Sequence, residues 1–212
     1  MFRLKRPSIH WLIISVLERL AALGMLAVLA PALLLVAIVT FILSRKSPLI
    51  AHCRLGLGGR PLWVLKFRTM WPDGGQSAAQ FGLVEYIVDE SGPRQKGARD
   101  HRISSSFARF CRRHSIDELP QLVHVVRGEM SLVGPRPVTA SEWQLHYHPH
   151  AAGVLEVKPG LSGLWQIKGR SRLSYEQRCD LDLKLVSNLT PKMYFQILLW
   201  TVPEVLTGRN GW

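Results

Sequence analysis

The feature that most constrains this chain is an uncharged run of 24 residues, from Leu20 to Leu43. As a straight α-helix the run would reach roughly 36 Å, which exceeds the ~30 Å hydrocarbon core of a bilayer. It is too long for the apolar part of a cleavable signal peptide, and no small-residue cleavage pattern follows it. The run therefore predicts a helix that enters a membrane.

The flanks of the run and one proline within it bear on how the helix sits in the membrane. Basic residues lie on both sides: Arg3, Lys5 and Arg6 before the run, and Arg45, Lys46, Arg54 and Arg60 after it. The positive-inside rule then favours neither orientation of a single crossing, but it is satisfied if both ends stay on the cytoplasmic side. Pro31 can kink the helix, and each half rises only about 17 Å. We therefore predict a membrane-embedded re-entrant hairpin over residues 1–46, with a kinked spanning helix as the alternative.

Residues 47–212 are expected to form the second part, so that the whole chain is an α+β protein that is mainly helical. Residues 47–70 combine β-rich runs with glycine turns and predict a small β-hairpin, whereas residues 71–99 predict a loop around one short helix. Helices are expected over residues 104–113 and 115–126, and from residue 175 onwards.

A second apolar stretch, from Met193 to Leu206, is too short to span a bilayer. It could lie in the membrane interface with Tyr194, Trp200 and Trp212 at the level of the headgroups. It could equally be a C-terminal helix that packs on the core. The sequence leaves both interpretations open.

The charge of the chain limits its partners. Its 27 Lys and Arg residues outnumber its 15 Asp and Glu residues, which gives a net charge of +12. Such a field favours anionic partners, namely nucleotide-linked substrates, anionic lipid headgroups or nucleic acid. The basic residues gather round an acidic pair rather than alternating with aromatic residues along a surface, so no nucleic-acid partner is expected.

The strongest chemical signal is this pair of adjacent carboxylates, Asp117 and Glu118, which follows a basic cluster at 109–114. Carboxylates can hold a divalent cation or attack phosphorus, and arginines bind phosphate oxygens. Ser115, with Glu118 three residues later, predicts a capping box that places both acids in the first turn of a helix ended by Gly128. Ordinary N-terminal capping is the plain alternative for the pair.

Four basic residues could serve the same anion. Arg112 could pair with the acids or form part of a diphosphate site. Arg136 lies between two prolines and has little freedom, which suits anion binding, with a structural ion pair as the alternative. Lys66 and Arg68 alternate with Phe67 as on a strand, so both are expected on one side, facing phosphate or simply solvent.

Four segments give the chain a resemblance to a known family: KFRTM (66–70), SIDELPQL (115–122), MSLVGPRP (130–137) and PGLSGLWQIKGRS (159–171). They resemble the bacterial sugar transferases, the monotopic polyprenyl-phosphate phosphoglycosyl transferases that initiate glycoconjugate synthesis. The resemblance extends from the membrane segment to the end of the chain. It implies a minimal catalytic form, with a catalytic domain at 47–212 and amphipathic interfacial helices around an active site on the cytoplasmic face of the bacterial inner membrane.

The resemblance also implies a two-step transfer of a sugar 1-phosphate from a UDP-sugar to polyprenyl phosphate, at the start of exopolysaccharide, capsule, O-antigen or glycoprotein glycan assembly. Asp117 would attack the β-phosphorus, UMP would leave, and polyprenyl phosphate would then take the phosphosugar from the aspartate. Glu118 would hold Mg²⁺, Lys66, Arg112 and Arg136 would help bind phosphate groups, and Asp182 would match a late aspartate of the site. The sugar stays open, and a membrane-embedded homodimer is compatible with the sequence.

Some positions depart from the pattern of the family. His124 stands where the family usually has Asn, Glu129 where it usually has Asp, and Ala30 precedes Pro31 where a serine is familiar. None of these changes removes a proposed catalytic group. Two other functions are the alternatives: a membrane-anchored protein that binds anionic lipid or nucleic acid, and a membrane phosphohydrolase that uses the same acids to activate water.

Overall fold

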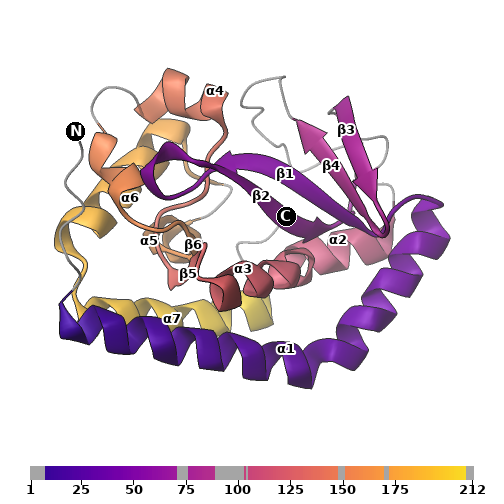
Figure 1. The fold of residues 1–212 in the computed structure, drawn as a ribbon, viewed down its shortest axis with the longest axis horizontal. Coiled ribbons are helices and arrows are strands. Elements are labelled where there is room, and N and C mark those ends of the chain that lie inside the picture. Colours follow the sequence, from indigo (N-terminus) through magenta and orange to yellow (C-terminus); the bar gives the residue numbers. More distant parts are fainter. Residues whose placement is uncertain are drawn as a thin grey trace.

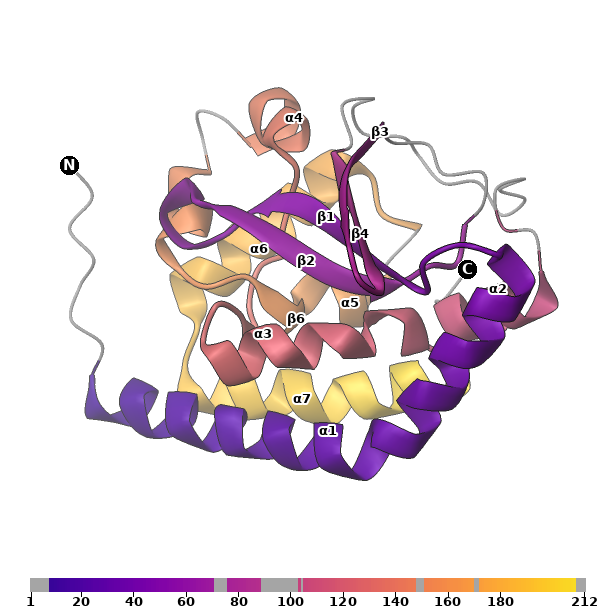
Figure 2. The same cartoon turned by 45° about the vertical axis from the view of Figure 1, so that its right-hand side comes forward.

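A small sheet, several short helices and two long apolar helices make up the structure. The computed structural model describes residues 8–70, 76–88, 103, 105–147, 151–169 and 172–208. Helices α1 and α7 run side by side along one edge of the molecule, with α3 next to them and the sheet beyond α3 (Figures 1 and 2). This arrangement confirms the predicted α+β class with mainly helical content.

The elements have the following bounds. The strands are β1 (Leu49–Leu55), β2 (Pro61–Phe67), β3 (Gln76–Phe81), β4 (Val84–Val88), β5 (Ser131–Val133) and β6 (Gly160–Ser162). The α-helices are α1 (Ile9–Ser44), α2 (Ser106–Arg113), α3 (Leu122–Arg127), α4 (Ala140–Glu142), α5 (Leu164–Lys168), α6 (Tyr175–Asn188) and α7 (Pro191–Thr207). Three short segments are 3₁₀ helices: η1 (Leu57–Gly59), η2 (Ile116–Gln121) and η4 (Ala152–Glu156). The segment η3 (Trp143–Tyr147) is a π-helix.

Helix α1 is one continuous helix of 36 residues with Pro31 inside it. Figures 1 and 2 show it bent into two arms that open away from each other, so it is not a pair of antiparallel helices. Proline lacks an N–H and clashes with the preceding turn, which accounts for the bend and agrees with the predicted kink. By length and composition α1 could cross a membrane, and only 6% of its most apolar window is buried in the protein.

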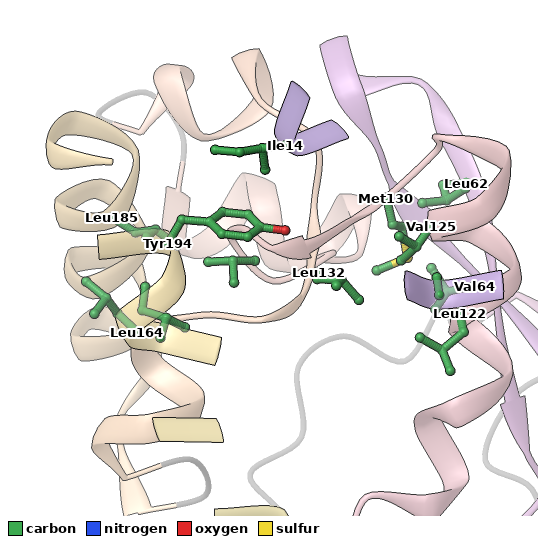
Figure 3. Close-up of a cluster of buried hydrophobic side chains, with 13 residues drawn as sticks. Ile14, Leu62, Val64, Leu122, Val125, Met130, Leu132, Leu164, Leu185 and Tyr194 are labelled. Carbon is green, nitrogen blue, oxygen red and sulfur yellow. The ribbon is translucent and has the colours of Figure 1, made fainter. Parts of the chain in front are cut away.

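The first arm of α1 packs on the folded body through one narrow seam. Ile14, Glu18 and Ala22 are buried at four-residue spacing, which places them on one face of the helix. Ile14 and Ala22 belong to the hydrophobic core shown in Figure 3, together with residues of β2, α3, α6 and α7. The first arm of the apolar helix is therefore part of the core.

A buried carboxylate, that of Glu18, holds the first arm of α1 to the folded body. Oε2 of Glu18 accepts hydrogen bonds from the Ser131 hydroxyl (2.7 Å), the Leu132 N–H (3.1 Å) and the Tyr194 hydroxyl (2.7 Å). A buried charge is costly unless hydrogen bonds satisfy it, and here three donors converge on one oxygen. Glu18 thereby joins α1 to β5 and to α7.

The larger sheet has the strand order β2-β1-β4-β3, which leaves β2 at one edge. Strands β1 and β2 form the predicted hairpin, in register from Leu49 opposite Phe67 to Leu55 opposite Pro61. Strand β4 runs parallel to β1 and antiparallel to β3. The sheet therefore combines two hairpins through a parallel contact between β1 and β4.

The expectation of a loop around one helix for residues 71–99 is wrong where the structure describes them. Strands β3 and β4 form a hairpin there instead, with Gly82 at its turn in a left-handed conformation (φ 55°). The physical reason is tertiary: β4 pairs with β1, and Tyr86 packs edge-on against Trp63 of β2 at 5.1 Å between ring centroids. Residues 71–75 and 89–99 lie outside the described part of the chain.

Of the two interpretations that the sequence left open for α7, packing on the core is confirmed for one face, and contact with the membrane interface stays a prediction. Tyr194 and Ile197 are buried in the core, so one face packs as a C-terminal core helix does. Tyr194 therefore does not lie at headgroup level, whereas Trp200 is 52% exposed. The exposed large apolar side chains of α7 are Phe195, Leu199, Trp200, Val202 and Leu206.

We expect Glu18→Ala to destabilise the protein by about 3 kcal/mol or more, because it leaves two buried donors and the partly buried Ser131 hydroxyl without this acceptor. Glu18→Gln keeps one acceptor oxygen and is expected to cost about 1 kcal/mol. Glu156→Ala, at an exposed position of η4, serves as the control. Thermal unfolding in detergent measures the three variants, and equal stability of Glu18→Ala and Glu156→Ala would contradict the role given to Glu18.

Candidate functional site

Asp117 and Glu118 lie in η2, a short 3₁₀ helix between α2 and α3. The predicted capping box is wrong, since Ser115 has a left-handed backbone (φ 56°) and its side chain makes no capping hydrogen bond. Pro120 has no N–H for an α-helical hydrogen bond, so the segment tightens into a 3₁₀ turn before α3 begins. Both acids still lie in the first helical turn, and Gly128 ends α3 as predicted.

Lys66, at the end of β2, reaches the acidic pair. Its Nζ donates to Oε1 of Glu118 at 2.6 Å, and the two side chains are 25% and 31% exposed. Asp117 is buried next to Cys111, whose thiol has its pKa raised to about 11 by burial and by the negative charge of Asp117. The site thus holds a largely buried carboxylate, Asp117, beside a more exposed one, Glu118.

Arg112 comes to the same region from the end of α2. Its side chain is buried, and its Nη1 donates to the hydroxyl of Thr69 at 3.3 Å. Thr69 follows β2 two residues after Phe67, within the KFRTM segment. The contact therefore holds the basic helix α2 against the strand that carries Lys66.

Arg68 has a different environment from Lys66. Its guanidinium is fully buried, Nε donates to the Ser47 carbonyl at 2.7 Å, and an ion pair joins it to Glu85 on β4. These contacts tie the end of β2 to the end of α1 and to β4. Arg68 therefore stabilises the packing of these elements, and its predicted role in binding phosphate stays a prediction.

The loop that carries Arg136 is positioned by a close approach of two backbones. Strands β5 and β6 lie parallel, and the Gly134 N–H donates to the Ser162 carbonyl at 2.9 Å. A Cβ on Gly134 would lie 2.5 Å from the Lys158 carbonyl oxygen and 2.7 Å from the Gly160 nitrogen, so only glycine allows this contact. The prolines on either side of Arg136 then limit the freedom of its backbone.

The Arg136 guanidinium lies against an aromatic ring and near the acids. It is 5.2 Å from the centroid of Trp165, and the guanidinium of Arg178 is 5.3 Å from the same ring. Burial lowers the pKa of Arg136, but the carboxylates of Glu142 and Glu118 are among the groups that more than offset this, and the net change is upward. Glu118 is thus near enough to Arg136 to act on it electrostatically.

Asp182, on α6, lies next to the backbone of Arg136 and is completely buried. The Tyr147 hydroxyl donates to its Oδ2 at 3.0 Å, and the backbone of Arg136 hydrogen-bonds it too. Among the described residues its Oδ1 has no hydrogen-bond partner. Burial raises the pKa of Asp182 to about 7 against these hydrogen bonds. The structure thus places Asp182 where it can support the Arg136 loop, and direct contact with substrate stays a prediction.

The acidic pair has the chemistry that Mg²⁺ requires. Mg²⁺ prefers oxygen ligands and commonly uses one or two carboxylates together with substrate phosphates and water. Among the described residues no group of three or more His, Cys, Asp and Glu side chains gathers as a closed metal site. Asp117 and Glu118 therefore suit a magnesium ion that arrives with a phosphorylated substrate. In the structure the positive charge next to Glu118 is that of Lys66.

Three residues of the site were not singled out from the sequence. Trp165 lies within the PGLSGLWQIKGRS segment, so the motif itself was a usable signal. Arg178 and Tyr147 carried none, because each joins the site through contacts with residues more than ten positions away along the chain. The loop segment at 170–171, which completes the motif, lies outside the described residues.

Comparison with known proteins agrees with the resemblance. A family model described as bacterial sugar transferase matches residues 9–208. Exopolysaccharide production protein ExoY of Rhizobium meliloti is 36% identical over 91% of this chain and 85% of its own length. UDP-glucose:undecaprenyl-phosphate glucose-1-phosphate transferase of Caulobacter vibrioides is 35% identical over 93% of this chain and 71% of its own length. Undecaprenyl-phosphate galactose phosphotransferase of Salmonella typhimurium is 35% identical over 76% of this chain and 33% of its own length.

The raised pKa of Asp182 predicts a pH-dependent stability. Because its folded value of about 7 lies above the ordinary 3.8, the protonated carboxyl stabilises the fold at low pH, and this contribution is lost as pH rises through about 7. The full range corresponds to about 4 kcal/mol. Relative to Asp182→Asn, the wild type should lose stability between about pH 4 and pH 7 and change little above about pH 8.

Thermal unfolding at several pH values measures this difference. Asp180→Asn, at an exposed position two residues before Asp182, is the control and should follow the wild type at every pH. An unchanged difference between the wild type and Asp182→Asn across this range would show that the carboxyl does not titrate there.

Proposed function

Because the chain belongs to the bacterial sugar transferase family, we propose that it transfers a sugar 1-phosphate from a UDP-sugar to undecaprenyl phosphate and releases UMP. Relatives that carry this activity in their names match most of the chain. The observation that carries the proposal is the arrangement of Lys66 and Glu118 at 2.6 Å beside Asp117. In this proposal Asp117 is the nucleophile, Glu118 the carboxylate that can bind a metal, and Lys66 the cation. The first two are neighbours on η2, and Lys66 reaches them from β2.

The first half of the proposed reaction forms a covalent intermediate. A carboxylate oxygen of Asp117 attacks the β-phosphorus of the UDP-sugar, the bond to the bridging oxygen breaks, and its electron pair leaves with UMP. In the second half a phosphate oxygen of undecaprenyl phosphate attacks the same phosphorus, and the bond to Asp117 breaks. The sugar phosphate thereby reaches the lipid as a diphosphate.

Neighbouring residues offset the repulsion between a carboxylate and an anionic phosphate. Lys66 and Arg136 lie around the acidic pair, and Arg112 approaches from α2. Their positive charges stabilise the charge that develops on the leaving phosphate. Glu118, and Asp117 before it reacts, would hold Mg²⁺, which supplies further charge neutralisation on the diphosphate when bound.

The exposed apolar faces suit a reaction with a lipid substrate. Large apolar side chains are exposed along both arms of α1, on α7 and at Phe110 of α2. Figures 1 and 2 show α1 and α7 side by side, so their exposed faces can meet one membrane surface together. We propose that this surface sits on the bacterial inner membrane, with anionic headgroups facing the basic chain and the active site on the cytoplasmic face. Dimerisation stays a prediction from the sequence.

The nucleophile assignment predicts the behaviour of Asp117→Asn. Given Mg²⁺ and UDP-glucose or UDP-galactose without lipid acceptor, the wild type should release about one UMP per active site and gain the mass of a hexose phosphate. Asp117→Asn should slow both by about a thousandfold or more, because an amide cannot form the acyl-phosphate intermediate. Intact-protein mass spectrometry and a UMP assay provide the two readouts.

Asp180→Asn is the matched control and should keep wild-type activity, since its side chain is exposed on α6. A mass adduct that survives in Asp117→Asn would place the nucleophile elsewhere. Continuous release of sugar phosphate by the wild type without lipid acceptor would instead indicate a phosphohydrolase.

If α1 is re-entrant, as the sequence predicts, both of its ends face the cytoplasm. Ser8→Cys and Lys46→Cys mark the two exposed ends, in chains that also carry Cys53→Ser. Cys111 and Cys179 are buried with thiol pKa values of about 11, so they react slowly with a maleimide. With a membrane-impermeant maleimide, both new cysteines should label only after spheroplasts are lysed. Labelling of either end in intact spheroplasts would indicate a spanning helix.

A further inference from the structure

His124 and Glu129, two positions that the proposed reaction does not use, contact each other in the structure. Nδ1 of His124 lies 2.6 Å from Oε2 of Glu129, and the imidazole is buried. The αL turn at Gly128 makes this possible, because the Glu129 N–H returns to the His124 carbonyl at 2.9 Å. Glu129 is thereby folded back over the ring of His124.

The other ring nitrogen of His124 faces the sheet. Nε2 accepts a hydrogen bond from the backbone N–H of Leu65 at 3.2 Å. Because a backbone N–H can only donate, Nε2 carries no proton in this contact, and Nδ1–H must donate to Glu129. Glu129 therefore fixes the tautomer in which His124 can accept from Leu65.

The Leu65 contact has a geometric role because β2 is an edge strand. The outer N–H groups of an edge strand have no neighbouring strand to pair with. His124 supplies an acceptor for one of them, at the residue directly before Lys66. Lys66 in turn contacts Glu118, six residues before His124 on the continuous η2–α3 segment.

Two adjacent residues of β2 are thus held to one helical segment by two hydrogen bonds. We propose that His124, oriented by Glu129, is a positioning residue that fixes β2 against η2 and so holds Lys66 at Glu118. The inference rests on the proposed function, in which Lys66 binds phosphate beside the nucleophile. His124 itself touches no reacting atom and acts only through the place it gives to Lys66.

Two substitutions test the contact of the imidazole with Leu65. His124→Gln can place its amide oxygen near the position of Nε2 and still accept from the Leu65 N–H. His124→Leu has a similar size but no acceptor, so it loses this hydrogen bond. We expect the single-turnover rate of UMP release from UDP-glucose or UDP-galactose to stay within about threefold of wild type in His124→Gln. It should fall about tenfold to a hundredfold in His124→Leu, since small displacements of a positioning group cost this much.

A double-mutant cycle with Lys66→Met separates positioning from a general loss of structure. If His124 acts through Lys66, His124→Leu should have little further effect once Lys66 is replaced, so the two effects are not additive. Rates are normalised to the folded fraction from thermal unfolding, and radiolabelled UDP-sugar keeps the slow variants measurable.

Fully additive effects of His124→Leu and Lys66→Met would overturn the inference, as would equal rates in His124→Leu and His124→Gln. Absence of UMP release by the wild type itself, with either sugar nucleotide, would instead count against the proposed function. The failure of one proposal can therefore be told from the failure of the other.

Discussion

The structure depends on a buried carboxylate that holds an apolar helix to a basic, catalytic body. Glu18 lies one residue before Arg19 and two before the uncharged run, and three donors from β5 and α7 meet its oxygen. The two other buried residues of the first arm, Ile14 and Ala22, make apolar contacts, which membrane lipid could supply equally well. A directional polar contact therefore sets which face of α1 meets the protein and which faces are left for lipid.

The same polar anchor relates the membrane surface to the site. Ser131 and Leu132, which donate to Glu18, belong to β5, and β5 leads directly into the Gly134–Pro137 loop that carries Arg136. The loop is in turn held by the close contact of Gly134 with β6 and by Asp182 beneath it. Two hydrogen bonds and a short stretch of backbone thus connect the helix that would enter the bilayer to the loop that carries Arg136. Such a path can hold the site at a constant height above the lipid surface.

The site itself is assembled from edges and ends of elements. Lys66 comes from the end of an edge strand, the acids from a 3₁₀ turn, Arg112 from a helix C-terminus and Arg136 from a proline-bounded loop. Each is held by a different local constraint. Lys66 is held by its ion pair with Glu118, the acids by Pro120 within the turn, Arg112 by its buried hydrogen bond to Thr69, and Arg136 by its two flanking prolines. Rigid placement of several charges is what electrostatic stabilisation of phosphoryl transfer requires.

Local pattern alone determined much of this protein. The apolar run, the kink at Pro31, the β1–β2 hairpin, the end of α3 at Gly128 and the order of the charged motifs all follow from residues close together in the chain. The tertiary structure alone decided the β3–β4 hairpin, the burial of Arg68 and Asp182, and the contact of His124 with Leu65. Each of these depends on a partner distant in sequence, such as β1 for β4 or Tyr147 for Asp182. The capping box at Ser115 failed for a related reason, because Pro120 and the contact of Glu118 with Lys66 outweigh a local propensity.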